Sequence, residues 1–178
     1  MTTVFHYKLL LPAGENPVTL SHSAHQDVMT LSISLFVLVS LVPFTDNFYS
    51  TDPGQITAVV GSQGAAFVGT AARVFTSQEL STVPFFHLFD GTINDSFYTT
   101  STFERDLALA NGYVVGGPDT FIYPTQICGS IPFFRLYDSA LTEHFYTTNA
   151  AVQASMLASG GWADEGVAGY VLDANVCA

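Results

Sequence analysis

The alternation of apolar and polar side chains in one stretch of the chain predicts a β-hairpin. In IPFFRLYD (131–138), the side chains alternate with the period of two that is typical of a half-buried strand. SALT (139–142) supplies a turn, and HFYTT (144–148) is a second strand rich in residues that favour strands. We therefore expect the two segments to pair as a hairpin.

The hairpin sequence occurs three times at nearly constant spacing. EHFYTT (143–148) follows DSFYTT (95–100), which in turn follows DNFYST (46–51). VPFFHLFD (83–90) matches IPFFRLYD in the same way. The chain is therefore a tandem repeat, with copies at about residues 35–82, 83–130 and 131–178, and the first copy is degraded at its front.

Each copy continues into a predicted helix and a third strand. Ser101 and Glu104 form a capping box at the start of the second helix. The cap position holds Asp52, Ser101 and Asn149 in the three copies, and glycines predict the helix ends at Gly64, Gly112 and Gly160/Gly161. DTFIYP (119–124) and VAGYVL (167–172) are predicted as third strands. Each copy is thus a ββαβ unit.

Three such units share one core, because none can bury its apolar face alone. The predicted fold class is β-rich α+β, with three tandem ββαβ repeats closed around a pseudo-threefold axis. A β-trefoil is the alternative, although a capped helix in every copy argues against it. Residues 1–28 match nothing in the repeat and are predicted to be an arm of uncertain order, followed by a single domain at 29–178.

The apolar segment MTLSISLFVLVSLVPF (29–44) has two interpretations. Its length matches the hydrophobic region of a signal peptide, which would fit a start of translation at Met29. A start at Met1 favours a buried strand. A membrane anchor is the weakest alternative, because the segment is short and rich in serine for a bilayer span.

The quoted motifs resemble an uncharacterised secreted repeat family built on an HFYTT motif, seen in fungi or attached to extracellular bacterial hydrolases. IPFFRLYD, EHFYTT and EGVAGYVL carry the resemblance, which covers about residues 44–178. Ser96 and Asn47 replace the motif histidine, so a role that needs this histidine in every copy is not implied. The resemblance implies a non-catalytic domain outside the cell that binds polysaccharide or a cell surface.

Composition and charge narrow the range of partners. The 178 residues are 48% apolar and 11% charged, which favours one folded domain over a disordered chain. Four basic residues against fifteen acidic ones give a formal net charge of −11. Such a surface repels phosphate backbones and anionic membranes, so nucleic acid is not expected as a partner. Low lysine content is typical of a secreted β-rich protein.

The two cysteines, Cys128 and Cys177, are separated by one repeat interval. They are too few for a zinc site with the usual four ligands. We predict a disulfide that joins the last two copies, worth about 3–4 kcal/mol on the chain-entropy model. Two free buried thiols are the alternative.

Motifs for catalysis or metal binding are weak. The sequence carries no hydrolase signature and no phosphate-binding glycine loop, so we predict no catalytic residue and no cofactor. HSAH (22–25) with Asp27 has a spacing found in metal sites, but it lies in the unmatched arm, and no metal site is predicted. Asp164 and Glu165 lack a surrounding calcium loop and are interpreted as a solvated turn.

Aromatic rings beside polar groups on the hairpins are the candidate ligand site. A ring covers the apolar face of a pyranose, while polar groups bond its hydroxyls. The candidates are Arg135, Tyr137, His144, Tyr146 and Thr148 in the third copy, His87, Phe89 and Tyr98 in the second, and Tyr49 in the first. The three tyrosines that precede the motif hydroxyls are favoured as core rings, because a core repeats as well. For Arg135, an ion pair with Asp138, Glu143 or another acid is an equal alternative.

Asn94 begins the sequon Asn94-Asp95-Ser96 in a predicted turn and is a candidate glycosylation site. Taken together, the sequence predicts a secreted, non-catalytic module that binds carbohydrate or a cell surface. A structural extracellular protein that self-associates is the second hypothesis, and a secreted hydrolase is the third.

Overall fold

The computed structural model describes residues 32–40, 46–63, 65–117 and 119–174. The predictions for the arm at 1–28, with its HSAH segment, and for Cys177 fall outside these residues. Residues 32–40 form a strand, which agrees with the strand interpretation of the segment 29–44. No helix among the described residues is long and apolar enough to cross a membrane.

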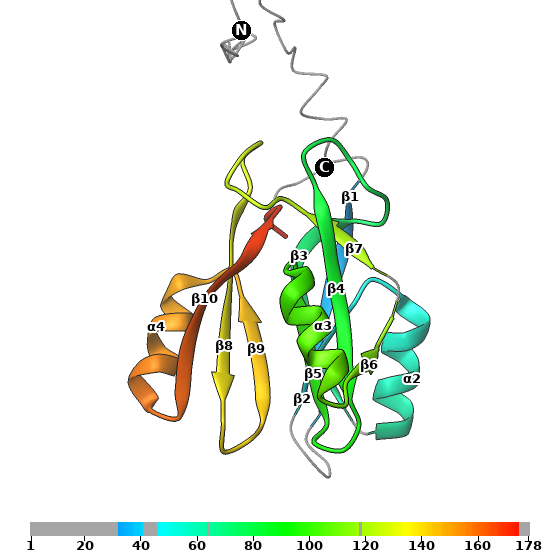
Figure 1. Cartoon of the computed structure of the whole chain (residues 1–178), viewed down its shortest axis with the longest axis vertical. Coiled ribbons are helices and arrows are strands. Elements are labelled where there is room, and N and C mark those ends of the chain that lie inside the picture. The colour runs from blue at the N-terminus through cyan, green and yellow to red at the C-terminus, as the bar shows by residue number, and fades with distance from the viewer. Residues whose placement is uncertain (1–31, 41–45, 64, 118, 175–178) are drawn as a thin grey trace, which may run out of the picture.

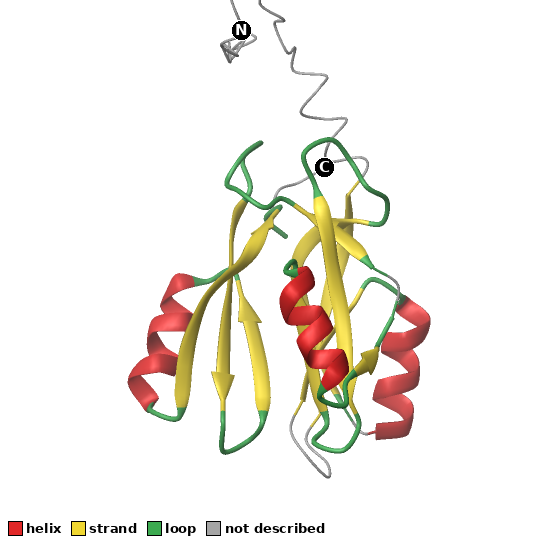
Figure 2. Cartoon of the chain, in the orientation of Figure 1, coloured by secondary structure: helices red, strands yellow, loops and turns green. Residues whose placement is uncertain are grey.

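Within these residues the chain forms three helices and two antiparallel sheets (Figures 1 and 2). The first copy contains β1 (Ser32–Ser40), β2 (Asp46–Ser50), α2 (Pro53–Gln63) and β3 (Ala66–Phe75). The second contains β4 (Val83–Asp90), β5 (Asp95–Thr99), α3 (Thr102–Ala110), β6 (Val114–Val115) and β7 (Thr120–Ile122). The third contains β8 (Ile131–Asp138), β9 (Glu143–Thr147), α4 (Ala150–Ser159) and β10 (Trp162–Val171). The predicted order of hairpin, helix and strand is present in each copy.

The two sheets divide the copies unequally. The larger sheet has the order β2-β1-β3-β7-β4-β5, with β6 added to β4, and the smaller sheet has the order β10-β8-β9. Isolated bridges between Arg73 and Leu172 and between Tyr123 and Tyr170 join the first two copies to β10. In Figure 1 the smaller sheet stands beside the larger one, with α4 on its outer side. Neither sheet closes into a barrel in the described part of the chain.

Side chains at the predicted cap positions begin all three helices. Ser101 accepts a hydrogen bond from Glu104 N at 3.2 Å. Asn149 Oδ1 accepts one from Ala151 N at 2.9 Å, and Asp52 Oδ1 accepts one from Gly54 N at 2.7 Å. These bonds satisfy main-chain N–H groups that have no partner inside the helix. The predicted cap residues are confirmed, but the predicted capping box is only half formed, because Ser101 N donates to Thr99 Oγ1 and the Glu104 carboxylate accepts from Arg135.

The core lies between the three hairpins. It is centred on the motif tyrosines Tyr49, Tyr98 and Tyr146, which are 2–3% exposed. Phe85 on β4 and Phe133 on β8 are each 1% exposed and pack against these rings. Both phenylalanines come from the Pro-Phe-Phe opening of a complete copy, so the repeated strand start supplies repeated core side chains.

Candidate functional site

The three motif tyrosines form a closed cycle of hydrogen bonds across the copies. Tyr98 Oη donates to the carbonyl of Tyr49 at 2.7 Å and accepts from Tyr49 N at 2.9 Å. Tyr49 Oη likewise donates to the carbonyl of Tyr146 at 2.8 Å and accepts from Tyr146 N at 2.9 Å. Tyr146 Oη donates to the carbonyl of Tyr98 at 2.8 Å and accepts from Tyr98 N at 2.8 Å. Each pair of rings has its centroids 5.5 Å apart in an edge-to-face arrangement. The rings are therefore core residues that join the copies, as favoured above, and each hydroxyl both donates and accepts a hydrogen bond inside the protein.

A second cycle of contacts lies three residues before each tyrosine and joins the copies in the opposite direction, from the acid of each copy to the next copy. Asp46 accepts from Ser96 N at 3.0 Å and from Ser96 Oγ at 2.9 Å. Asp95 accepts from His144 N at 2.9 Å and lies 2.7 Å from His144 Nδ1. Glu143 accepts from Asn47, which closes the cycle. Each acid thus contacts the residue at the motif-histidine position of another copy, which is Ser96, His144 or Asn47. We call the contact between two consecutive copies a junction.

At the junction of the second and third copies, Arg135 is held by two acids. Its Nη1 and Nη2 donate to the two carboxylate oxygens of Glu104, both at 2.9 Å. Its Nε lies 2.8 Å from Glu165 Oε2, an ion pair without hydrogen-bond geometry. The guanidinium also stands over the Phe97 ring, 5.1 Å from its centroid. The ion-pair alternative is therefore realised for Arg135, with acids other than Asp138 and Glu143.

His144 extends this charged group. Its imidazole lies between Asp95 and Glu165, with Nε2 3.5 Å from Glu165 Oε2, and Tyr113 Oη donates to Asp95 at 2.6 Å. The Tyr137 ring packs against the imidazole with centroids 4.7 Å apart. We call Arg135, Glu104, Glu165, His144 and Asp95 the Arg135 cluster. It contains two of the predicted site residues, Arg135 and His144, but their polar groups are paired with the acids of the cluster.

Electrostatics in the Arg135 cluster stabilises the charged forms. The hydrogen bonds from Arg135 lower the pKa of Glu104 to about 2, against an opposing effect of burial. Burial lowers the pKa of His144, but hydrogen bonds to Asp95 and Glu165 outweigh it, and the net pKa is raised. The hydrogen bond to His144 lowers the pKa of Glu165. Arg135, His144 and three acidic side chains therefore share one partly buried site.

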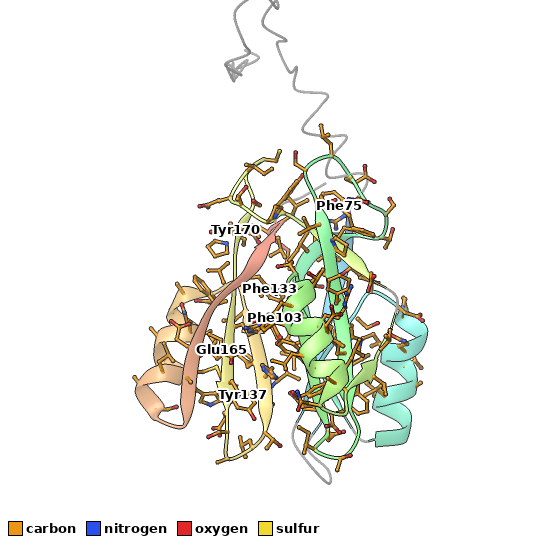
Figure 3. All side chains as sticks on the ribbon, in the orientation of Figure 1. Phe75, Phe103, Phe133, Tyr137, Glu165 and Tyr170 are labelled. Carbon is orange, nitrogen blue, oxygen red and sulfur yellow. The ribbon has the colours of Figure 1, made fainter. Side chains whose placement is uncertain are left out.

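A β-bulge aims Glu165 at this cluster. The register of β10 on β8 shifts between Asp164 and Val167, and Gly166 there has a φ of 84°. Figure 3 shows Glu165 on β10 and Tyr137 on β8. Asp164 and Glu165 are exposed, as expected for solvated residues, but the predicted turn is wrong, because both lie within β10 and Glu165 is an ion-pair partner.

His87 takes the place of Arg135 at the junction of the first and second copies. In the strand pairing, His87 lies opposite Tyr98 as Arg135 lies opposite Tyr146. The imidazole is stacked on the Tyr98 ring, with centroids 4.3 Å apart and an angle of 6°. It is 8% exposed, and its Nε2 has no hydrogen-bond partner among the described residues. Burial lowers the pKa of His87 to about 4, so the ring is neutral at pH 7.

The charged partners of Arg135 are replaced at this junction by neutral or smaller residues. Gln55 takes the place of Glu104 and accepts from Ser50 Oγ at 2.7 Å, as Glu104 accepts from Thr99. Gly117 takes the place of Glu165 in the sequence register of the two copies. Gly116 is needed for the imidazole to fit, because a Cβ on it would lie 2.6 Å from His87 Cε1.

A pocket of about 150 Å³ opens beside His87. It is lined by Asp46, Phe48, Val59, His87, Phe89, Asn94 and Gly116, and we call it the His87 pocket. Asp46 and His87 are 5% and 8% exposed, whereas Phe48, Val59 and Phe89 are half-buried. Burial raises the pKa of Asp46 to about 7, against the hydrogen bonds from Ser96. A smaller cavity of about 30 Å³ lies on the other side of His87, lined in part by Ser50, Gln55 and Thr120.

Residues 43–172 match the family described as a domain of unknown function, DUF5648. The chain belongs to this family. No curated protein and no solved structure matches the DUF5648 chain. The family description names no activity, so the function must be argued from the site.

The structure brings together some of the predicted site residues of this DUF5648 domain. His87 and Phe89 line one pocket, Arg135 and His144 belong to the Arg135 cluster, and the Tyr137 ring packs against His144. Thr148 lies beyond the end of β9 and is half-buried. Asn94 lines the His87 pocket, in a turn with a φ of 56°. Cys128 is exposed and unpaired within the described residues, and its predicted partner Cys177 lies outside them.

Sequence reasoning missed the residues that the first copy contributes to the pocket. Asp46, Phe48 and Val59 line it from β2 and α2. It also missed Glu104 as the partner of Arg135. The sequence did contain a signal for this contact. Arg135 in the third copy corresponds to His87 in the second, and Glu104 in the second copy corresponds to Gln55 in the first. Paired differences of this kind between copies indicate a contact.

Proposed function

We propose that this DUF5648 domain is a non-catalytic, extracellular module that binds carbohydrate in the His87 pocket. The observation that carries the proposal is a pocket with polar groups at its deep end and aromatic rings on its walls. Phe48 and Phe89 offer apolar faces to a sugar ring, while Asp46 and His87 can bond its hydroxyls.

The comparison with the Arg135 cluster supports an uncharged ligand. At that junction the protein fills the space with its own guanidinium, two glutamates and an imidazole. At the junction of the first and second copies, Gln55 and Gly117 stand in the places of Glu104 and Glu165 and line the smaller cavity, and burial lowers the pKa of His87 to about 4. This lower charge around His87 suits a neutral, hydroxyl-rich molecule better than an ion.

Binding is favoured over hydrolysis by the groups that line the pocket. Glycoside hydrolysis uses a pair of carboxyl groups on either side of the bond that breaks. Asp46 is the one carboxyl group in the lining of the His87 pocket, and it already accepts two hydrogen bonds from Ser96. The lining therefore offers contacts for a sugar without the paired acids of a glycosidase.

We also propose that the three copies are arranged around a common pseudo-threefold axis. The cyclic order of the tyrosine contacts and of the acid contacts supports this arrangement. On this view the junctions are equivalent places in the fold, which is why one can be filled by protein side chains while another is left open.

A glycan array with purified protein tests the binding function. We expect the wild type to bind neutral glycans and His87→Phe to lose at least tenfold in affinity, because phenylalanine keeps the ring on Tyr98 and removes both nitrogens. Leu80→Ala is the control, since Leu80 is 92% exposed and outside the pocket. The proposal is wrong if the wild type binds no glycan, or if His87→Phe binds as well as Leu80→Ala does.

Exposed apolar side chains favour self-association as a second candidate function. Phe103 and Leu107 on α3 are 76% and 53% exposed, and Val115 on β6 is 68% exposed. Contiguous apolar surface of this kind is typical of contacts between proteins. Light scattering after size exclusion tests this candidate: a dimer or larger species that Phe103→Ser converts to monomer supports it, and a wild-type monomer at high concentration contradicts it.

A further inference from the structure

We propose that the exposed first half of β3 is the surface through which two copies of this chain associate. It consists of Ala66, Phe67, Val68 and Thr70, and we call it the β3 surface. The inference rests on the self-association candidate above, but it places the contact on β3 instead of α3 and does not depend on carbohydrate binding. It follows from the exposure of these side chains, from the residues at the same places in β10, and from the distribution of charge.

The β3 surface is mostly apolar and lies where few described strands cover β3. This strand pairs with β1 along its length, whereas its pairs with β7 and with Leu172 are confined to Phe75 and Arg73, near its C-terminal end. Phe67 and Val68 are 54% and 62% exposed. Apolar side chains that protrude together from the edge of a strand are typical of a contact with another chain.

The fold does not require apolar side chains at these places, because β10 has acids there. Both strands are bulged against the first strand of their copy, and a glycine with a positive φ follows in each. When the two copies are aligned on this glycine, Phe67 and Val68 correspond to Asp164 and Glu165. Charged side chains on an exposed strand edge keep other chains from pairing with it. β10 therefore has a protection that β3 lacks.

The distribution of charge favours a second copy as the partner. Residues 53–72, which include α2 and the β3 surface, contain no charged side chain, whereas the whole chain has a formal net charge of −11. Two copies repel each other through their acidic parts, and this repulsion is weakest where they meet through an uncharged segment. A twofold axis at the β3 surface would bring the same apolar side chains of both copies together, as in most protein dimers.

Light scattering after size exclusion, over a series of concentrations, tests the inference with charge-matched variants of the full chain. Phe67→Asp with Val68→Glu gives β3 the acids that β10 carries, so the fold should tolerate this change. Phe103→Asp with Leu107→Glu on α3 is the control, because it adds the same charges at side chains that are 76% and 53% exposed. We expect the wild type and the α3 variant to form dimers, and the β3 variant to dissociate at least tenfold more readily.

Hydrogen exchange in the wild type locates the contact and does not depend on the folding of any variant. The amides of residues 66–70 should exchange at least fivefold more slowly in the dimer than after dilution to monomer, because the second copy covers them. The amides of residues 163–167 in β10 are the internal control and should exchange equally under both conditions.

The outcomes separate this inference from the candidate function beneath it. A wild type that stays monomeric at millimolar concentration would overturn both. A dimer that persists in the β3 variant and dissociates in the α3 variant would overturn this inference alone. Slow exchange of residues 66–70 at every concentration would show that a segment of the same chain covers the β3 surface, and would also overturn the inference.

Discussion

At the junction of the second and third copies, Arg135 lies between Glu104 and Glu165, whereas at the junction of the first and second copies, His87 occupies the same register position beside a pocket. The contacts beneath the two side chains are the same: a motif tyrosine bonds the main chain of another, and an acid bonds the next copy. The surrounding side chains differ in charge and size.

The difference shows how a repeat protein can separate stability from binding. The tyrosine cycle provides the same connection at both junctions, so the outer side chains are free to change. At the junction of the second and third copies, the polar groups of the Arg135 cluster are paired with one another. The other has a neutral imidazole and open space, at the energetic cost of a buried nitrogen without a partner in the described structure.

Removing the central side chain of each junction should give the largest contrast. Arg135→Ala leaves Glu104 and Glu165 without their cation and should lower the free energy of unfolding by about 2–4 kcal/mol, below the value for fully buried pairs because both acids are partly exposed. His87→Ala should cost about 1 kcal/mol, because lost stacking is offset by removal of the unpaired nitrogen. Urea unfolding at pH 7 measures both. Equal costs would show that the two junctions do not differ as described.

Breaking the tyrosine cycle should affect both junctions alike. Tyr98→Phe removes the partner of the N–H and carbonyl of Tyr49, and Tyr146→Phe does the same for Tyr98. Each variant leaves buried main-chain groups without a partner and should cost about 1–3 kcal/mol. The same urea measurements should give values that agree within experimental error. A clearly larger loss of unfolding free energy for one variant would show that the two junctions also differ in their tyrosine contacts, and not only in the side chains around Arg135 and His87.

The buried acid of the His87 pocket should make stability depend on pH. Because the pKa of Asp46 is raised to about 7, its contribution is complete below pH 4 and is lost as the pH rises through 7. Asp46→Asn removes this loss, so its free energy of unfolding relative to wild type should increase by about 1 kcal/mol or more between pH 4 and 8. His87, with a pKa lowered to about 4, acts in the opposite direction in both proteins and cancels in the difference. A difference that stays constant with pH would contradict the burial of this acid.

Rebuilding the charged pair in the pocket should have the smallest effect on stability. Gln55→Glu alone should cost less than about 1 kcal/mol, and adding His87→Arg should recover it through a partly exposed ion pair worth about 0.2–1 kcal/mol. A double-mutant cycle in urea measures the coupling. The double variant should also lose glycan binding, because it replaces His87, which lines the pocket. Undiminished binding would mean that the ligand lies elsewhere.

Local features of the fold could be predicted because they depend on nearby residues. The hairpins and the helix caps at Asp52, Ser101 and Asn149 follow from patterns a few residues long, and the structure contains them. The repeat itself also gave the order of elements in each copy. The strand β6 and the bulge at Glu165 were not predicted, because both depend on pairing with β4 or β8.

The site was harder to predict because its contacts join distant segments. Arg135 needed a partner, but nothing in the sequence near it identified Glu104, 31 residues away. The side of the strand that faces the core was also ambiguous, because the motif has aromatic rings at adjacent positions. The surroundings of His87 depend on the absence of a side chain at Gly116 and of a second charged group beside the imidazole. A cavity that arises from absent side chains can be recognised only when the packing of the copies is known.

The position of Asn94 in the lining of the His87 pocket makes the choice of expression host part of any binding measurement. A glycan attached to this asparagine would supply sugar units in the immediate neighbourhood of Phe48 and Phe89, which line the same pocket. Material from a bacterial host lacks that modification. The same polypeptide prepared in two hosts would then differ in its apparent affinity without any change in sequence.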